Sequence, residues 1–244
     1  MRLTRIHVAA PLVVGHEVTL PESAAAHLAR VLRLQPGDPC VLFNGDGHDY
    51  AARITILGKR EVRALVESAR ALDNESPLRI TLVQGVARGE KMDWILQKAT
   101  ELGVHAFVPA SSERSEVRLD GERADKRLAH WRSVVIAACE QSGRARIPSV
   151  APSQSLPLAL SSLQGTARFL LDPLAPQGII DVAPPDIEGC VLAVGPEGGW
   201  SPRDRAMLQG AGFSALRLGP RVLRTETAGI AAIAALQSRF GDFG

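Results

Sequence analysis

The sequence predicts an α/β protein in which a mainly parallel sheet, with helices between its strands, follows a small β-rich domain. Two patterns and the composition predict this class. Short β-prone runs separated by turn residues fill the first 70 residues, whereas strand-like and helix-like runs alternate from residue 80 onward. The 244 residues are 45% hydrophobic and 22% charged, which supplies enough apolar material for one large core or two modest ones.

The N-terminal part predicts a small barrel with one helix. Strands are expected at residues 39–43, 48–57 and 60–67. The turns between these strands contain glycines, which tolerate the positive φ that tight hairpins need. A helix is expected over 21–34, because Leu28, Val31 and Leu32 share one stripe and Pro36 follows them.

The rest of the chain predicts alternating strands and helices. The polar stretch 71–77 is expected to be a linker. Beyond it, strands are expected at 80–86, 104–108, 169–171, 190–194 and 213–218, and helices at 90–102, 123–141, from 201 and at 227–239. In the first of these helices the apolar residues recur at helical spacing on a single face. Residues 151–189 are proline-rich and, apart from the strand at 169–171, are the least readable part of the chain.

Composition and cysteine usage exclude several classes of protein. The net charge of +2 gives no chain-wide basic footprint for nucleic acid, and 4% aromatic residues leave few stacking platforms. Cys40, Cys139 and Cys190 are widely spaced without a C-x-x-C pair, so neither a disulfide framework nor a metal site is expected. The longest small-apolar run, 228–236, is too short to span a membrane. We therefore expect a soluble cytoplasmic protein.

The most informative segment runs from Val191 to Pro202, where a buried strand leads into a turn with three glycines. Ser201 and Asp204 form an S-x-x-D capping pattern, and Pro202 suits the first helical position. Glycines here let the backbone approach a flat or anionic ligand at the carboxyl end of a strand. An ordinary glycine-rich turn is the alternative. No Gly-Lys-Ser/Thr follows and the glycine spacing is not that of a dinucleotide fold, so a phosphate cradle is disfavoured.

A second turn, between Leu216 and Ala228, combines a Gly-Pro pair with two arginines, a glutamate and two threonines. Thr225 or Thr227 suits a helix N-cap and Glu226 suits a first helical turn, so a purely structural role is the alternative reading. We expect the two Gly-Pro turns to follow neighbouring strands and to form one cleft.

Charged residues also concentrate at 88–103, 111–115 and 138–148. Most of these charges are typical of a solvated helix face. Arg144 and Arg146 differ, because they lie in a loop bounded by Gly143 and Pro148 and suit the recognition of phosphate or base.

Five sequence blocks, in this order, resemble the RsmE-type 16S ribosomal RNA uridine-N3 methyltransferases: KMDWILQKATELGV, SERSEV, AACEQSGRARIP, VGPEGGWS and LGPRVLRTETA. The run HLARVLR at 27–33 extends the resemblance into the first half of the chain. Each block alone is weak evidence, but five in order are highly specific. Residues 151–189 match no motif.

The resemblance implies a SPOUT-type α/β domain with a deep trefoil knot over 73–244 and a PUA-like β-barrel RNA-binding domain over 1–72. It also implies S-adenosylmethionine (SAM) as cofactor, 16S rRNA of the small ribosomal subunit as partner, and a homodimer. By motif position, the cofactor-binding residues are Leu171, Gly195, Pro196, Glu197, Gly198, Gly199, Leu218, Gly219, Leu223 and Arg224.

The implied reaction is methylation of N3 of a specific uridine. Uracil N3 carries a proton at neutral pH, and that proton must leave before or during attack on the sulfonium methyl. Arg224 is expected to support the anionic O2/O4 edge and Glu226 to position or deprotonate N3, with a purely structural role as the alternative for each. N3 lies on the Watson–Crick edge, so the target must be unpaired or flipped out. RNA contacts are expected from His27, Arg30, Arg33, Lys91, Arg114 and Arg144.

Other functions stay open on the sequence alone. A SPOUT ribose 2′-O-methyltransferase of rRNA or tRNA needs the same cofactor loops, and a non-catalytic RNA-binding ribosome-assembly protein would keep a vestigial pocket. An ATPase is disfavoured because the phosphate-loop lysine is missing. The small-sided helix 228–236 fits either core packing or a dimer interface. The positive charge is in excess locally, at 1–70, 79–150 and 217–244, where the motifs expected to bind RNA and to act in catalysis lie.

Overall fold

The computed structural model describes residues 3–21, 34–58, 61–116, 121–164, 167–185 and 189–244. The chain forms two compact units. Unit 1 comprises Met1–Glu75 together with Cys139–Ile147, and unit 2 comprises Ser76–Ala138 and Pro148–Gly244. The helix predicted at 21–34 falls almost entirely outside the described residues.

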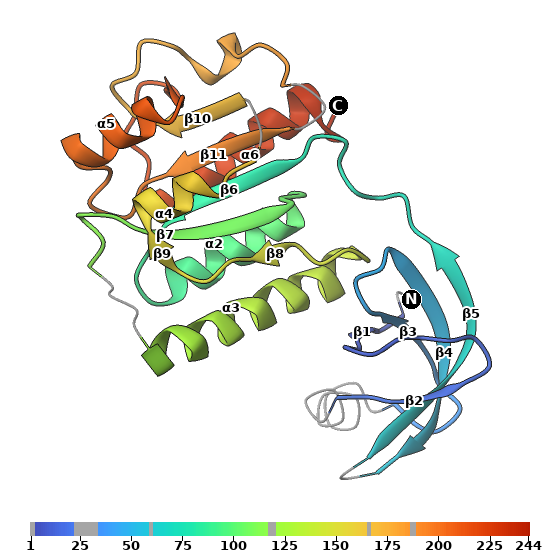
Figure 1. The fold of residues 1–244 in the computed structure, drawn as a ribbon. Helices are drawn as coiled ribbons and strands as arrows, with labels where there is room; N and C mark the ends of the chain where they lie inside the picture. Colours follow the sequence, from blue (N-terminus) through green and yellow to red (C-terminus); the bar gives the residue numbers. More distant parts are fainter. Residues whose placement is uncertain (1–2, 22–33, 59–60, 117–120, 165–166, 186–188) are drawn as a thin grey trace. The chain divides into compact units, whose positions relative to one another are not determined.

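Unit 1 contains a five-stranded sheet among its described residues, ordered β1-β3-β4-β5-β2 (Figure 1). Its strands are β1 (Arg5–His7), β2 (Glu17–Thr19), β3 (Pro39–Phe43), β4 (His48–Leu57) and β5 (Val62–Ala71). β1 pairs with β3 in parallel and the other pairs are antiparallel. The three strands predicted here are confirmed, although β5 extends into the stretch predicted as linker. β1 and β2 are too short for their alternation to be read from the sequence.

The turn between β3 and β4 shows why its composition matters. Gly45 and Gly47 have φ of 94° and 95°, a region that glycine enters without steric cost. The strands on either side bury alternate residues, among them Leu42, Tyr50 and Ile54, in one apolar cluster. The hairpin therefore follows from two local signals, a glycine turn and period-two burial.

Unit 2 alternates strands and helices around one sheet. Its strands are β6 (Ile80–Gly85), β7 (Ala106–Ser111), β8 (Ser149–Val150), β9 (Gln154–Ser155), β10 (Ala167–Leu171), β11 (Cys190–Val194) and β12 (Ser214–Leu216). Its helices are α2 (Glu90–Glu101), α3 (Gly121–Ser142, whose last four residues belong to unit 1), α4 (Leu156–Ser161), the short 3₁₀ helix η2 (Ile179–Asp181), α5 (Pro202–Gly210) and α6 (Thr225–Phe240).

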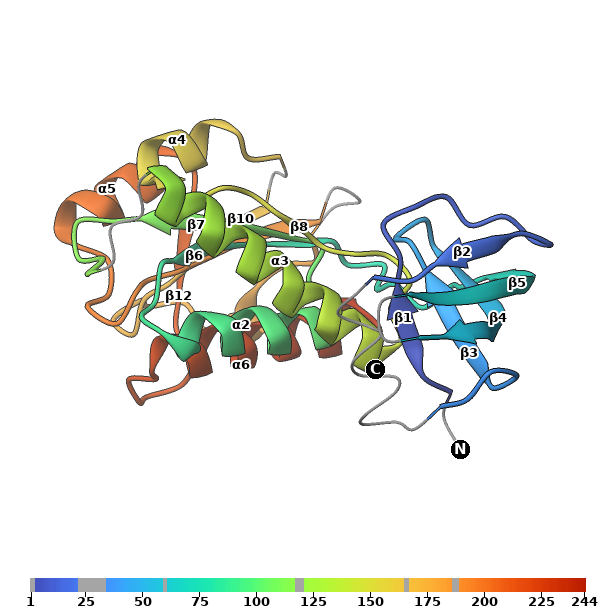
Figure 2. The ribbon, with the colours of Figure 1, turned by 90° about the horizontal axis from the view of Figure 1, so that it is seen from below.

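The sheet of unit 2 is parallel in every described pair, in the order β12-β10-β11-β6-β7-β8, with β9 also paired to β7. This confirms the predicted α/β class. Helices α2 and α6 lie on one face of the sheet, and α4 and α5 on the other (Figure 2). The central strand β11 is buried along its whole length, as expected for a strand covered by helices on both faces.

The end of α2 and the start of α5 follow the signals in their sequences. In α2 the face that carries Met92, Ile95, Leu96 and Ala99 is buried, and the following Gly103 adopts φ of 85°. In α5 the Ser201 hydroxyl accepts from the Asp204 amide at 3.0 Å, while the Asp204 carboxylate accepts from the Ser201 amide at 3.0 Å. This is the predicted capping box, and it fixes the direction in which the chain leaves the glycine turn.

One expectation about the sheet is wrong. The strands before the two Gly-Pro turns, β11 and β12, are not neighbours, because β10 pairs with both and lies between them. The stretch 151–189, in which the sequence predicts a strand only at 169–171, contributes β10 together with β9, α4 and η2. As a result, three strand ends rather than two contribute to the edge of the sheet at which the turns lie.

Candidate active site

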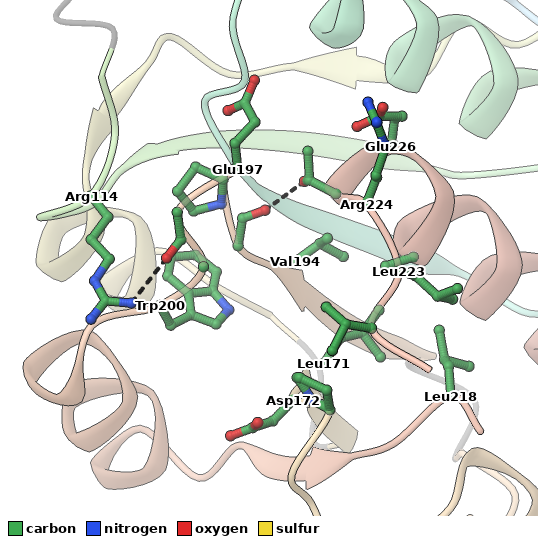
Figure 3. Close-up of a pocket in the computed structure, with 18 of the residues that line it drawn as sticks. Arg114, Leu171, Asp172, Val194, Glu197, Trp200, Leu218, Leu223, Arg224 and Glu226 are labelled. Carbon is green, nitrogen blue, oxygen red and sulfur yellow. Dashed lines mark hydrogen bonds between the residues drawn. The ribbon is translucent and has the colours of Figure 1, made fainter. Parts of the chain in front are cut away.

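A cavity of about 470 Å³ opens in unit 2 where the chain leaves β10, β11 and β12, and the first turn of α6 completes its wall (Figure 3). Ligands of parallel α/β sheets bind beyond the carboxyl ends of the strands, and this cavity lies at that edge. Its walls include nine of the ten residues predicted to bind a cofactor: Leu171, Gly195, Pro196, Glu197, Gly198, Gly199, Leu218, Leu223 and Arg224. The tenth, Gly219, has φ of 68° in the turn that precedes α6 but is not among the lining residues.

The glycine turn after β11 has almost no free space on its inner side. A Cβ atom on Gly195 would lie 3.1 Å from the backbone of Gly199, and one on Gly85 of the adjacent β6 would lie 2.5 Å from the ring of Pro196. Gly199 has φ of 65°, and nothing lies within 4 Å of the place where its Cβ would be. The turn is therefore packed tightly against β6, while Gly199 leaves open space for a ligand.

Electrostatic contacts also hold this turn. The Glu197 carboxylate accepts a hydrogen bond from the Arg88 amide at 3.1 Å and lies 3.2 Å from Lys91 Nζ. Partial burial alone would raise the pKa of Glu197, but these hydrogen bonds and the lysine charge outweigh it and lower the pKa below its ordinary value. Arg114 Nη1 donates to the Gly198 carbonyl at 3.0 Å, the contact drawn in Figure 3.

The opposite wall comes from the start of α6. Arg224 is the N-cap residue and makes no side-chain capping bond, while Glu226 lies in the first turn. Both line the cavity, and the Glu226 Oε2 atom is buried without a hydrogen-bond partner. Thr225 is buried between them and its hydroxyl donates to the Gly195 carbonyl at 2.5 Å. The structure therefore assigns Thr225 a contact with the glycine turn instead of the N-cap role that the sequence suggested.

The walls of the cavity carry an excess of positive charge. Five basic residues (Lys91, Arg114, Arg205, Arg221 and Arg224) accompany three acidic ones (Asp172, Glu197 and Glu226). Two of these acids already have partners, because Glu197 pairs with Lys91 and Asp172 lies 3.0 Å from Arg205. The site is therefore suited to a ligand, or a pair of ligands, that brings negative charge.

The structure divides the residues predicted to contact RNA into three groups. Lys91 and Arg114 line the cavity. Arg144 belongs to unit 1, where its side chain is only 7% exposed and its guanidinium pairs with Glu75. The reason is local: Arg5 also donates to the Arg144 carbonyl, so the loop after α3 is held inside unit 1 instead of facing solvent. His27, Arg30 and Arg33 lie outside the described residues.

Several residues of the site gave no readable signal in the sequence. Asp172 and Arg205 form a pair across the cavity wall, and Glu113 accepts from the Ser201 hydroxyl at 2.6 Å. Gln84, at the end of β6, is fully buried and reaches Thr225. The one signal that could have indicated Gln84 is its place as a polar residue in an otherwise apolar strand. A polar side chain buried in this way is normally hydrogen-bonded, which indicates a partner such as Thr225.

Neither thiol chemistry nor a metal site is apparent in the described part of the chain. Burial raises the pKa of Cys40 to about 11 and those of Cys139 and Cys190 to about 12, which leaves each thiol protonated. Among the described residues no cluster of three or more His, Cys, Asp or Glu side chains is arranged to hold a metal ion. Within the same residues, none of the helices has the length and apolar character to cross a membrane.

Comparison with known families matches both parts of the chain. A family model described as an RNA methyltransferase domain matches residues 74–237, and one described as an RNA methyltransferase PUA domain matches residues 20–67. Among curated proteins, the ribosomal RNA small subunit methyltransferase E of Buchnera aphidicola is 33% identical over 99% of this chain and 98% of its own length. The protein of the same name from Mycobacterium bovis is 37% identical over 89% of this chain and 88% of its own length.

Solved structures agree in fold over the full length. A ribosomal RNA small subunit methyltransferase E from Neisseria gonorrhoeae, bound to SAM, has a TM-score of 0.92 and 42% identity and covers 100% of both chains. A protein from Legionella pneumophila with bound SAM has a TM-score of 0.93 and 36% identity over 99% of this chain and 100% of its own.

Proposed function

Because the chain belongs to the ribosomal RNA small subunit methyltransferase E family, we propose that it methylates N3 of one uridine of 16S rRNA, the family's U1498 target, with SAM as methyl donor. Membership confirms the predicted fold class, a SPOUT-type knotted methyltransferase domain preceded by a small PUA-like domain. The observation that carries the proposal is the cavity at the ends of β10, β11 and β12, whose walls contain nearly every residue predicted to bind the cofactor.

The residues of this cavity fit SAM. Its volume of about 470 Å³ falls within the range of small-molecule sites, roughly 300–1,000 Å³. Leu171, Val194, Leu218 and Leu223 offer apolar wall for an adenine ring, while the open space at Gly199 lets backbone groups approach polar parts of the ligand. When bound, SAM supplies a methyl group activated by its sulfonium charge.

We assign the handling of the uracil to two residues at the start of α6, the N-cap residue Arg224 and Glu226 of the first turn. Glu226 Oε2 is buried and has no partner in the described structure, so this carboxylate is able to accept the N3 proton or to orient N3 by a hydrogen bond. Arg224 is exposed at the same helix terminus and can stabilise the negative charge that develops on O2 and O4. Holding both groups beside the cofactor cavity makes transfer effectively intramolecular.

The charge of the cavity favours RNA as the second ligand. SAM is a net cation, so it leaves the excess of basic side chains in the cavity uncompensated. Phosphates that flank a flipped-out uridine would compensate it. Within unit 2 we assign RNA contact to two residues that line the cavity. They are Arg114 and Lys91, which pairs with Glu197. In unit 1, the same role stays a prediction for His27, Arg30 and Arg33.

Three further parts of the proposal concern organisation. We place RNA docking in the PUA-like domain (1–72) and catalysis in the SPOUT domain (73–244). We propose a homodimer, supported by the half-buried face of α6 that carries Ala228, Ala231, Ala234 and Ala235, because small side chains allow close approach of a second backbone. Sedimentation equilibrium tests the dimer. A cytoplasmic location, where ribosomal subunits assemble, belongs to the same proposal.

The experiment that tests this function measures SAM binding and methyl transfer together. The purified protein is incubated with radiolabelled SAM and either unmodified small subunits or naked 16S rRNA. Label in 16S rRNA supports an rRNA methyltransferase. SAM binding without transfer to either substrate, or no SAM binding at all, favours the non-catalytic RNA-binding alternative and contradicts the proposal.

A further inference from the structure

A buried hydrogen-bond bridge connects the two walls of the cavity. Gln84 is fully buried near the end of β6, and its Nε2 donates to the Thr225 hydroxyl at 3.0 Å and to the Gly85 carbonyl at 2.9 Å. The Thr225 hydroxyl in turn donates to the Gly195 carbonyl at 2.5 Å, and this contact is drawn in Figure 3. Three segments that are far apart in sequence therefore meet at one hydroxyl group.

The orientation of every group in this bridge is determined by its neighbours. The Gly195 carbonyl can only accept a hydrogen bond, so the Thr225 hydroxyl donates its one proton to it. The same hydroxyl must then accept the hydrogen bond from Gln84. A flipped Gln84 amide would direct its oxygen at the Gly85 carbonyl, which is repulsive. Gln84 Oε1 is left without a hydrogen-bond partner and lies 3.8 Å from where a Cβ of Gly229 would be, so this oxygen faces α6 at a position without a side chain.

We propose that Gln84 and Thr225 are positioning residues for methyl transfer, holding the first turn of α6 at a fixed place beside the cofactor turn. The inference rests on the proposed function, because the neighbours that they position are Arg224 and Glu226. Neither bridge residue is assigned contact with the uracil or with the methyl group. Each acts through the backbone of the residues next to it.

The bridge matters more for α6 than for the glycine turn. That turn has independent anchors in the Glu197 contacts, in the Arg114 bond to Gly198 and in the close packing of Pro196 on Gly85. Among the described residues 224–228, by contrast, Thr225 makes the only side-chain hydrogen bonds. Loss of its hydroxyl should therefore displace Arg224 and Glu226 while the cofactor turn keeps its shape.

This asymmetry predicts a difference between catalysis and cofactor affinity. Thr225→Val removes the hydroxyl at nearly constant volume and is expected to lower kcat by about tenfold or more, the equivalent of one buried hydrogen bond. The Kd for SAM should change less than threefold. Thr225→Ser restores the hydroxyl and should recover most of kcat. The matched control is Thr100→Val in α2, because Thr100 is also buried and its hydroxyl donates to the Leu96 carbonyl at 2.7 Å, away from the cavity.

A double mutant tests whether the two residues act as one unit. Gln84→Leu alone should also lower kcat, because it removes the donor that orients the Thr225 hydroxyl. If the bridge is a unit, combining Gln84→Leu with Thr225→Val should cost little more than the worse single change. Fully additive losses would show that the two side chains act independently and would contradict the bridge.

Amide hydrogen exchange gives a readout that does not depend on activity. In Thr225→Val without RNA, exchange should accelerate at the amides of 225–229 but not in Thr100→Val. Unchanged exchange there, or a kcat loss no greater than that of Thr100→Val, overturns the inference. A wild-type protein that binds SAM but methylates no RNA contradicts the proposed function instead, and the exchange experiment still tests the bridge.

Discussion

Gly85 provides the sharpest test of how the cofactor turn is built. In Gly85→Ala the new Cβ would lie 2.5 Å from both Cδ and N of Pro196 and 3.0 Å from the carbonyl carbon of Gly195. These are ring and backbone atoms, so no rotamer change relieves the contact. The φ of Gly85 is outside the positive region, so alanine brings no backbone strain of its own. The turn itself must move.

The expected size of this effect follows from overpacking. Forcing one methyl group into a well-packed site costs about 1–3 kcal/mol, and if the turn absorbs that cost the Kd for SAM rises by about 5- to 150-fold. Isothermal titration calorimetry with SAM measures it. Gly210→Ala is the matched control, because nothing lies within 4 Å of its Cβ position at the end of α5. A folded Gly85→Ala protein that binds SAM as tightly as Gly210→Ala would refute this account of the turn.

Three further predictions concern individual side chains of the site. Glu226→Gln is expected to lower kcat by about 10²- to 10⁴-fold with SAM affinity unchanged, in single-turnover assays; a rate within twofold of wild type would remove Glu226 from the chemistry. Arg114→Gln should weaken RNA binding and reduce the slope of log Kd against log salt by about 0.7 to 0.9; an unaltered slope would mean that Arg114 contacts no phosphate. The pKa of Glu197 is lowered in the folded state, so its stabilisation is complete above its ordinary pKa of 4.5 and is lost as the pH falls through the lower folded value. Urea unfolding at a series of pH values should show a shallower acid dependence in Glu197→Gln, and an identical dependence would contradict the ion-pair assignment.

The fold could be predicted wherever local signals agreed. The apolar face of α2, the Ser201–Asp204 capping box and the glycine turn between β3 and β4 each combine a sequence pattern with one structural solution. β10 is different: its position between β11 and β12 depends on how distant strands pair, and no local pattern in its sequence specifies that. The expected single cleft exists, and its third wall, where the chain leaves β10, contains Leu171, a residue that the family resemblance indicates but that no local pattern does.

In the candidate site, too, local sequence patterns indicated some residues, whereas the roles of others depend on contacts with distant parts of the chain. Glycines and charged residues at strand ends indicated the cavity, because their chemistry is unusual for a turn. Gln84 was overlooked because one glutamine within a strand has many ordinary explanations, and its partner Thr225 suited a helix cap equally well. Arg144 shows the converse: a loop arginine suits RNA recognition on its local sequence, but Glu75, from a distant part of the sequence, pairs with its guanidinium.

The measurement closest to the central claim is the identity of the methylated nucleoside. Small-subunit rRNA methylated by the purified protein is digested to nucleosides and compared with N3-methyluridine and 2′-O-methyluridine standards by mass spectrometry. Reverse transcription then locates the mark, because a methyl group on N3 blocks base pairing. We expect N3-methyluridine at a single position, with a strong stop there at ordinary nucleotide concentrations. A ribose-methylated product, with a stop only when nucleotides are scarce, would contradict it and establish the 2′-O-methyltransferase alternative.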